Sequence, residues 1–181
     1  MTMIELDLDY PEPAAAPTEA DLTGALCDWY RSRGSGAGGP RFAVAAQVRS
    51  RAGFDARRTC DFVAMDLWPS KGLGLHGHEI KVSRSDWLRE LAEPEKSAEF
   101  IPYMNCWWIV TAGRRMVRDG ELPDGWGLMA VDDGVLTVVR RAARRDALPL
   151  TPTRLAALLR AVAQTAAYLE RRHYEKRAGR S

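Results

Sequence analysis

Apolar residues at helical spacing predict a first helix over 18–33. The residues that would share its buried face are Leu22, Leu26, Trp29 and Tyr30. Thr18 and Asp21 have the spacing of a capping box, so we expect the helix to begin there. The glycine-rich stretch 34–40 (GSGAGGP) breaks the pattern and predicts a flexible loop.

Short apolar runs then predict a series of strands. They cover 42–48, 60–68, 75–83 and 107–111. The stretch 69–72 (PSKG) consists largely of turn-forming residues and predicts a hairpin between the second and third of these strands. Asp133-Gly134 predicts another hairpin, between 128–131 and 135–139. Trp107 and Trp108 lie in a buried-looking strand, so we expect them in the core rather than on a base-stacking surface.

Two further helical regions complete the pattern. The segment 83–86 (SRSD) has the capping-box form and predicts a helix through Leu91, which Pro94 interrupts before a second piece over 95–103. Thr151-Pro152 predicts an N-cap and the first turn of a long helix. The apolar stripe of this helix, which we expect to pack on the core, is formed by Leu155, Leu158, Leu159, Val162, Ala166 and Leu169. The order of elements predicts a mixed α/β domain.

At 181 residues, the chain suits one domain. We expect that domain to cover 18–174, including the C-terminal helix over 152–174, with a flexible acidic and Pro/Ala-rich arm over 1–17 and a frayed basic tail over 175–181. No apolar run approaches the roughly 20 residues of a membrane helix, and the first residues lack the basic start of a secretory signal. Three widely spaced cysteines without metal spacing suit a reducing compartment, so a cytoplasmic protein without membrane contact is expected.

The charge of the chain is distributed unevenly. Residues 1–21 hold six acids and no Lys or Arg, so 18 of the 24 acids remain in the rest of the chain against 26 Lys and Arg. This basic body suits a polyanionic partner such as DNA, although a solvated arginine-rich surface has the same composition. The cluster Arg140, Arg141, Arg144 and Arg145 is a candidate phosphate-binding patch, with a solvated face as the alternative.

The third predicted strand has one polar face. Because side chains alternate along a strand, Glu79, Lys81 and Ser83 share one face, while Ile80 and Val82 occupy the other. His76 and His78 belong to the second face, so we expect a core or surface role for them rather than metal ligation. An acid and a lysine on the same face of a sheet strand require partners or solvent.

A carboxylate partner for Glu79 lies across the predicted hairpin. A turn centred on Ser70 sets Asp61 opposite Glu79, with Cβ atoms roughly 4.5–5.5 Å apart. Two carboxylates at this separation repel each other unless a cation lies between them, and such hard oxygen ligands suit Mg²⁺ or Mn²⁺. A tighter turn at Gly72-Leu73 would instead oppose Asp66 to Glu79, so Asp66 is a reserve ligand.

Asp61, followed about 18 residues later by Glu79-Ile80-Lys81, resembles the core of the PD-(D/E)xK nucleases. A longer set of segments, within roughly 57–145, resembles the MmcB-like DNA repair family. These segments are Glu79–Asp86, Lys96, Tyr103–Trp108, Leu122-Pro123 and Trp126–Leu128. The chain departs from the family pattern at Met104-Asn105, where the family usually has Cys-Asp, and in extra residues around 90–95.

This resemblance implies a restriction-endonuclease-like fold with a mixed central sheet flanked by helices. It also implies Asp61 and Glu79 as ligands of Mg²⁺ or Mn²⁺, with Lys81 assisting the attacking water or the transition state. The expected function is a metal-dependent DNA endonuclease in repair. The alternative is a catalytically silent DNA-binding or partner-docking module. A homodimer, a repair-protein partner and an RNA substrate remain open.

The resemblance also suggests roles for Ser83, Asp86 and Lys96 around the same pocket. Each has a simpler reading, because Ser83 and Asp86 suffice as helix-capping residues and Lys96 as a solvated surface residue. Glu19 is a candidate third carboxylate, although a role in the first turn of its helix is favoured.

Overall fold

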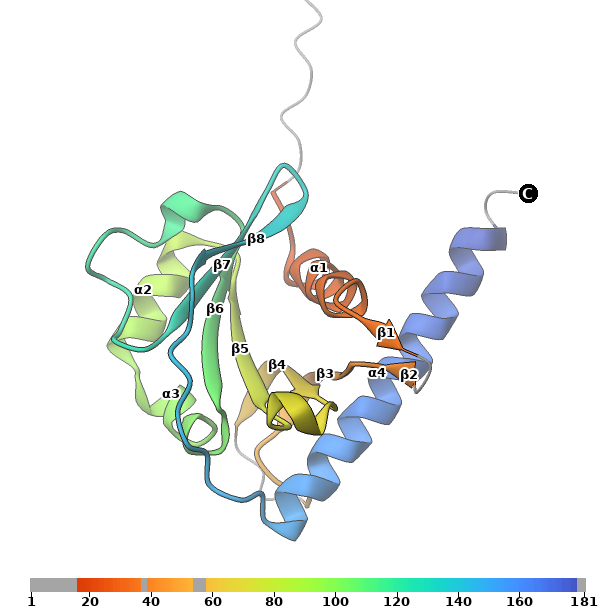
Figure 1. Cartoon of the computed structure of the whole chain (residues 1–181). Helices are drawn as coiled ribbons and strands as arrows, with labels where there is room; N and C mark the ends of the chain where they lie inside the picture. Colours follow the sequence, from red (N-terminus) through yellow and green to blue (C-terminus); the bar gives the residue numbers. More distant parts are fainter. Residues whose placement is uncertain (1–15, 37–38, 54–57, 179–181) are drawn as a thin grey trace, which may run out of the picture.

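The computed structural model describes residues 16–36, 39–53 and 58–178. Its centre is a six-stranded sheet in the order β3-β4-β5-β6-β7-β8 (Figure 1). The strands are β3 (Phe42–Arg49), β4 (Thr59–Asp66), β5 (Leu75–Lys81), β6 (Cys106–Thr111), β7 (Gly127–Asp132) and β8 (Val135–Arg140). The inner strands β5, β6 and β7 run parallel, while the outer pairings are antiparallel. The predicted α/β class, with a mixed central sheet flanked by helices, is therefore confirmed.

Helices cover both faces of this sheet. Helix α1 (Glu19–Arg31) lies on one side, and α2 (Arg84–Ala92) and α3 (Glu95–Ala98) lie on the other (Figure 1). The long α4 (Pro152–Ala178) runs past the edge strand β3. The remaining short elements are a ribbon of β1 (Ser35–Gly36) and β2 (Gly39–Pro40), and the 3₁₀ turns η1 (Pro69–Lys71), η2 (Ile101–Tyr103) and η3 (Arg114–Met116).

The core is divided by the sheet, as the alternation of strand side chains requires. Ile80 joins the cluster under α1, while the fully buried Trp107 belongs to the opposite face. Trp107 pairs with Gly77 on β5, and Trp108 pairs with Gly127 on β7. Each indole occupies the space that a side chain at its glycine partner would fill. The expected core role of Trp107 is confirmed, and Trp108 is half-buried against the α1 cluster.

Several predicted boundaries change in the structure. The stretch 34–40 contains the short paired strands β1 and β2 rather than only a loop. The second helical piece, expected over 95–103, is α3 followed by η2. The strand expected to reach Ser83 ends at Lys81, because Ser83 instead caps α2. Helix α4 continues to Ala178, beyond the expected end at 174.

The apolar stripe predicted for α4 was partly wrong. Leu158 is buried as expected, but Leu155 and Leu159 are 44% and 59% exposed, and Ala166 is exposed as well. The buried face instead uses Ala157, Ala161 and Thr165. The hydroxyl of Thr165 accepts a hydrogen bond of 2.9 Å from the backbone N–H of Ala46 in β3. Leu158, Val162 and Leu169 pack on the core as predicted, beside these small and polar residues, whereas Leu155 and Leu159 turn away from it.

Candidate active site

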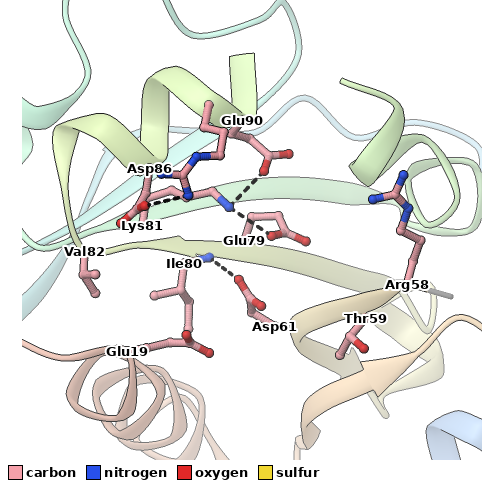
Figure 2. Close-up of a pocket in the computed structure, with 11 residues that line it drawn as sticks. Glu19, Arg58, Thr59, Asp61, Glu79, Ile80, Lys81, Val82, Asp86 and Glu90 are labelled. Carbon is pink, nitrogen blue, oxygen red and sulfur yellow. Dashed lines mark hydrogen bonds and ion pairs between the residues drawn. The ribbon is translucent and has the colours of Figure 1, made fainter. Parts of the chain in front are cut away.

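A polar pocket of about 460 Å³ opens beside the ends of β4 and β5 that lie away from their hairpin turn (Figure 2). The sheet, α1 and α2 all contribute to its lining. Its ionisable lining residues are Glu19, Arg58, Asp61, Glu79, Lys81, Asp86, Arg89 and Glu90. The pocket therefore brings together Asp61, Glu79, Lys81 and Asp86, which the sequence singled out.

The hairpin register explains why Asp61 and Glu79 meet. The antiparallel ladder pairs Phe62 with His78, which places Asp61 across from Glu79 as a turn centred on Ser70 predicts. Regular pairing ends at this point, and the Asp61 carboxylate accepts a 2.8 Å hydrogen bond from the backbone N–H of Ile80. This contact fixes the Asp61 side chain beside the backbone of the Glu79 strand.

Asp66, the reserve ligand, lies elsewhere, so that alternative was wrong. Its backbone N–H donates to the carbonyl of Gly74 at 2.9 Å, next to the hairpin turn. Its carboxylate accepts hydrogen bonds from two nitrogens of the Arg41 guanidinium, with Nε at 3.0 Å from Oδ2. Asp66 therefore fixes the opposite end of the hairpin through an ion pair.

Lys81 lies between two carboxylates in the pocket (Figure 2). Its ammonium nitrogen is 3.3 Å from Glu79 Oε2 and 2.9 Å from Glu90 Oε2. Glu90 is only 5% exposed, and its other oxygen accepts a hydrogen bond from Ser97 Oγ. The acid that lies closest to Lys81 is therefore one that the sequence interpretation did not include.

Glu90 could have been found from the pattern of α2. Trp87, Glu90 and Leu91 stand at helical spacing, and Trp87 is fully buried while Leu91 packs against the same cluster. A glutamate within an inward apolar stripe requires a buried partner. Lys81 supplies that partner from β5.

Electrostatics distinguish Glu79 from an ordinary glutamate. The pKa of Glu79 is raised to about 9, chiefly by burial and also by the neighbouring Asp61 carboxylate, against the opposing effect of Lys81. Burial lowers the pKa of Lys81, but the charges of Glu79 and Glu90 outweigh this effect and the net shift is upward. The pocket thus holds a charged lysine beside a carboxyl group that binds its proton tightly.

Ser83 and Asp86 form the cap of α2. Ser83 Oγ accepts from the backbone N–H of Asp86 at 3.1 Å and donates to Asp86 Oδ2 at 2.6 Å. Asp86 also pairs with Arg89 at 3.3 Å and lines the pocket, whereas Ser83 is not part of the lining. Lys96 belongs to α3, and its side chain lies outside the described part of the structure.

Glu19 takes its place in the first turn of α1, and its carboxylate also lines the pocket. The capping box at the start of α1 is formed by Thr18 and Asp21, as predicted. Gln47 Nε2 donates to Glu19 Oε1 at 2.8 Å, while burial and the charge of Asp61 raise the pKa of Glu19. Gln47 has a left-handed φ of 52° within β3, so the strand is distorted beside the pocket.

The two histidines of β5 lie outside the pocket. His78 is fully buried, with Nε2 at 3.0 Å from the hydroxyl of Tyr30 and Nδ1 at 3.3 Å from the carbonyl of Phe62. His76 accepts a 3.4 Å hydrogen bond from Trp108 Nε1. Both side chains therefore contribute to the packing under α1, as the strand alternation indicated.

Two members of the arginine cluster stabilise loops. The Arg140 guanidinium donates to backbone carbonyls of 122–126, among them that of Pro123 at 2.7 Å. Arg144 Nη2 donates to the carbonyl of Gly72 at 3.2 Å. These contacts give Arg140 and Arg144 structural roles, whereas the phosphate-patch interpretation of the cluster stays a prediction.

Within the described ranges, no three His, Cys, Asp or Glu side chains form a ready metal-binding group. The donor set at the pocket is the pair of Asp61 and Glu79. Mg²⁺ commonly keeps several waters and binds proteins through one or two carboxylates, so this pair fits such a cation chemically. A bound cation would oppose the raised pKa of Glu79, because a nearby positive charge favours the ionised carboxylate.

The comparisons with known proteins bear on the fold of this chain and not on the chemistry of the pocket. No protein-family model matches the chain, and no curated protein matches it. A solved structure described as "SPO1766 protein of unknown function from Silicibacter pomeroyi" is similar, with a TM-score of 0.50 and 19% identity. The alignment covers 76% of this chain and 82% of that one. In the described part of this chain, no helix combines the length and hydropathy that a membrane span requires.

Proposed function

We propose that this protein is a metal-dependent DNA endonuclease of the restriction-endonuclease-like PD-(D/E)xK class, acting in DNA repair. Asp61 and Glu79 would hold Mg²⁺ or Mn²⁺, and Lys81 would assist the reaction. The observation that carries the proposal is the convergence of two strand carboxylates and a partly buried lysine on one open, polar pocket. The resemblance of 79–86 to the MmcB-like DNA repair family supports DNA as the substrate.

The placement of these groups on neighbouring strands of a sheet supports a catalytic role for them. Asp61 and Glu79 come from neighbouring strands, whose positions are fixed by the ladder that begins at the next residue pair. Groups on rigid elements keep the geometry that a reaction needs. Burial and the charge of Asp61 make Glu79 costly to ionise, and a cation held between the two carboxylates would offset this cost.

Each residue has a distinct task in this proposal. A cation bound by the two carboxylates would polarise a phosphate oxygen and lower the pKa of a bound water. The Lys81 ammonium, held in place by Glu90, would donate a hydrogen bond to that water or to the charge developing on phosphate oxygens. Arg58 and Arg89 line the same pocket and would attract the phosphate backbone.

A catalytically silent DNA-binding or partner-docking module is the second candidate. The observation that favours it is the engagement of Lys81 by two carboxylates, since this ion-pair network needs neither substrate nor metal. A cytoplasmic setting belongs to either function and is supported by the free, buried thiols of Cys27, Cys60 and Cys106. A homodimer or a repair-protein partner is compatible with both candidates.

The test is cleavage of labelled single-stranded, duplex, flap and junction DNA, with RNA in parallel, in Mg²⁺, in Mn²⁺ and in EDTA. Asp61→Asn, Glu79→Gln and Lys81→Ala are compared with wild type, and Glu170→Gln serves as a matched control on an exposed part of α4. We expect cleavage that requires the metal and falls by about 10²–10³-fold in Lys81→Ala. Glu170→Gln should cleave like wild type.

Binding measured on the same substrates separates the two candidates. If wild type and all three pocket variants bind DNA equally and none of them cuts it, the docking module replaces the nuclease as the proposed function. RNA cleaved in preference to DNA would retain the chemistry and change the substrate.

A further inference from the structure

Two arginine–tryptophan pairs lie near the hairpin end of β4 and β5, away from the pocket. The guanidinium carbon of Arg33 is 3.3 Å from the centroid of the Trp29 ring. That of Arg41 is 5.0 Å from the centroid of Trp68. These distances are those of cation–π contacts. We refer to Trp29, Arg33, Arg41 and Trp68 together as the Arg–Trp strip.

Backbone contacts hold the two pairs next to each other. The backbone N–H of Arg41 donates to the carbonyl of Gly34 at 2.9 Å, which closes the base of the β1–β2 ribbon. The Trp68 ring lies beside Gly34, since a methyl group at that glycine would be 3.7 Å from the indole. Gly34 directly follows Arg33 in the chain. The strip is therefore continuous from α1 to the hairpin turn.

Asp66 makes the hairpin side of the strip rigid. Its carboxylate accepts from the Arg41 guanidinium, and it also accepts from the backbone N–H of Trp68 at 3.1 Å. The charges of Asp66 and Arg41 cancel within this pair. Arg33 and Lys71 of the turn, both exposed, add positive charge to this surface, and Arg144 lies beside the turn at Gly72.

The strip presents apolar surface to solvent at the same place. Trp68 is 37% exposed, and its neighbours Leu67 and Leu73 are 40% and 46% exposed. Leu73 also adopts a left-handed φ of 46°, a conformation that costs a bulky residue free energy. An exposed leucine in a strained turn beside an exposed tryptophan marks a binding surface rather than a folding requirement.

We infer that the Arg–Trp strip binds the unpaired bases of a single-stranded nucleic acid. Indole faces and planar guanidinium groups stack on bases of any sequence, while neighbouring cations attract the phosphates. Aromatic rings interleaved with arginine are the combination found on such stacking surfaces. An acidic peptide would match the charge, but it would not present an aromatic base at every unit to stack on Trp68.

The position of the strip relates it to the pocket. Seven residues of extended chain separate Asp61 from Trp68, which corresponds to about 23 Å. A stacked strand rises 3.4 Å per nucleotide, so about seven nucleotides would cover this distance. This step rests on the proposed function, and it assigns the nuclease a substrate with a single-stranded segment that passes from the strip to the pocket.

The experiment measures fluorescence anisotropy of labelled oligo-dT of increasing length, in EDTA so that cleavage cannot contribute. Wild type is compared with Trp68→Ala, with Trp68→Phe and with Tyr174→Ala, which removes an aromatic residue that is 77% exposed on α4. We expect Trp68→Ala to weaken binding by between about 5-fold and 150-fold. Trp68→Phe should retain most of the affinity, because a π-face remains. Tyr174→Ala should bind like wild type.

Arg33→Gln provides a second, independent readout. Loss of one phosphate-facing cation should reduce the slope of log affinity against log salt by about one. The inference is overturned if Trp68→Ala and Tyr174→Ala bind equally, if polyglutamate competes as well as oligo-dT, or if Trp68→Phe loses as much affinity as Trp68→Ala. The last result would indicate a packing role for the indole.

The two proposals fail in different ways. If the strip is wrong but the nuclease is right, Trp68→Ala will cut single-stranded DNA with an unchanged KM. If the nuclease is wrong but the strip is right, oligo-dT will still bind in EDTA and Trp68→Ala will still weaken it, while no metal produces cleavage.

Discussion

A double-mutant cycle on Lys81 and Glu90 tests whether their ion pair is a buried, energetically significant contact. The two side chains are 13% and 4% exposed, and their charged atoms are 2.9 Å apart. Removing one partner of a buried pair leaves the other charge desolvated, which costs about 3–5 kcal/mol. We therefore expect Lys81→Met to lower the free energy of unfolding by about 3 kcal/mol. Glu90→Gln should cost less, because its amide can still contact Ser97.

The coupling energy is the sharper quantity. Residues of one buried network show coupling energies of about 0.5–3 kcal/mol, and this pair should lie near 2 kcal/mol. The matched control is the pair of Arg89 and Asp86 on α2, which is 3.3 Å apart with side chains 61% and 34% exposed. Screening by water should reduce its coupling to about 0.3–0.5 kcal/mol.

Urea unfolding followed by circular dichroism, at pH 7 and in EDTA, gives both cycles. The slope of the unfolding free energy against urea concentration must be the same in all variants, since a changed slope would report a changed denatured state. Equal coupling in the two pairs would refute the reasoning. So would a Lys81–Glu90 coupling below about 0.5 kcal/mol, because Glu79 alone would then suffice to hold the lysine.

Three further outcomes follow from other contacts. Asp61→Asn removes one of two apposed carboxylates, so in EDTA it should raise the melting temperature by about 2–4 °C; Mg²⁺ should then stabilise wild type but not the variant in thermal melts. Burial lowers the pKa of His76 to about 4, so the folded protein binds fewer protons than the unfolded chain. The unfolding free energy of the protein should therefore fall as pH drops from about 6.5 to about 4. Urea titrations should show a smaller fall over this pH range for His76→Asn, and an equal fall in variant and wild type would contradict the reasoning. Thr165→Ala leaves the N–H of Ala46 without its acceptor and should cost about 1–3 kcal/mol in urea unfolding, whereas Thr165→Ser should cost less; equal losses would point to the methyl group instead.

The sequence predicted the strand part of the site because the signals were local. Turn residues at 69–72 and the alternation of 75–83 left two hairpin registers open, and the structure has the one centred on Ser70. That register placed Asp61 opposite Glu79, and the same alternation separated His78 from the pocket. Within one hairpin, a turn position and a period of two determine which side chains meet.

Other features depend on contacts between distant segments. The pattern of α2 indicates that Glu90 faces inward, but its partner Lys81 is set only when α2 packs against the sheet. The buried face of α4 includes Thr165, whose hydroxyl bonds to Ala46, 119 positions away in the chain. The left-handed conformation of Gln47 likewise has no sign in its neighbours, because glutamine normally continues a strand.

The pairing of two tryptophans with two glycines has a consequence for how the sequences of related chains vary. Trp107 fills the space above Gly77 on one face of the sheet, and Trp108 fills the space above Gly127 on the other. Sliding β6 by one residue would set each indole against a neighbour that has a side chain. Related chains should therefore change positions 77 and 107 together, and positions 127 and 108 together, with a larger residue at one position accompanied by a smaller one at the other. Such paired substitutions would preserve the parallel register that carries Glu79 and Lys81.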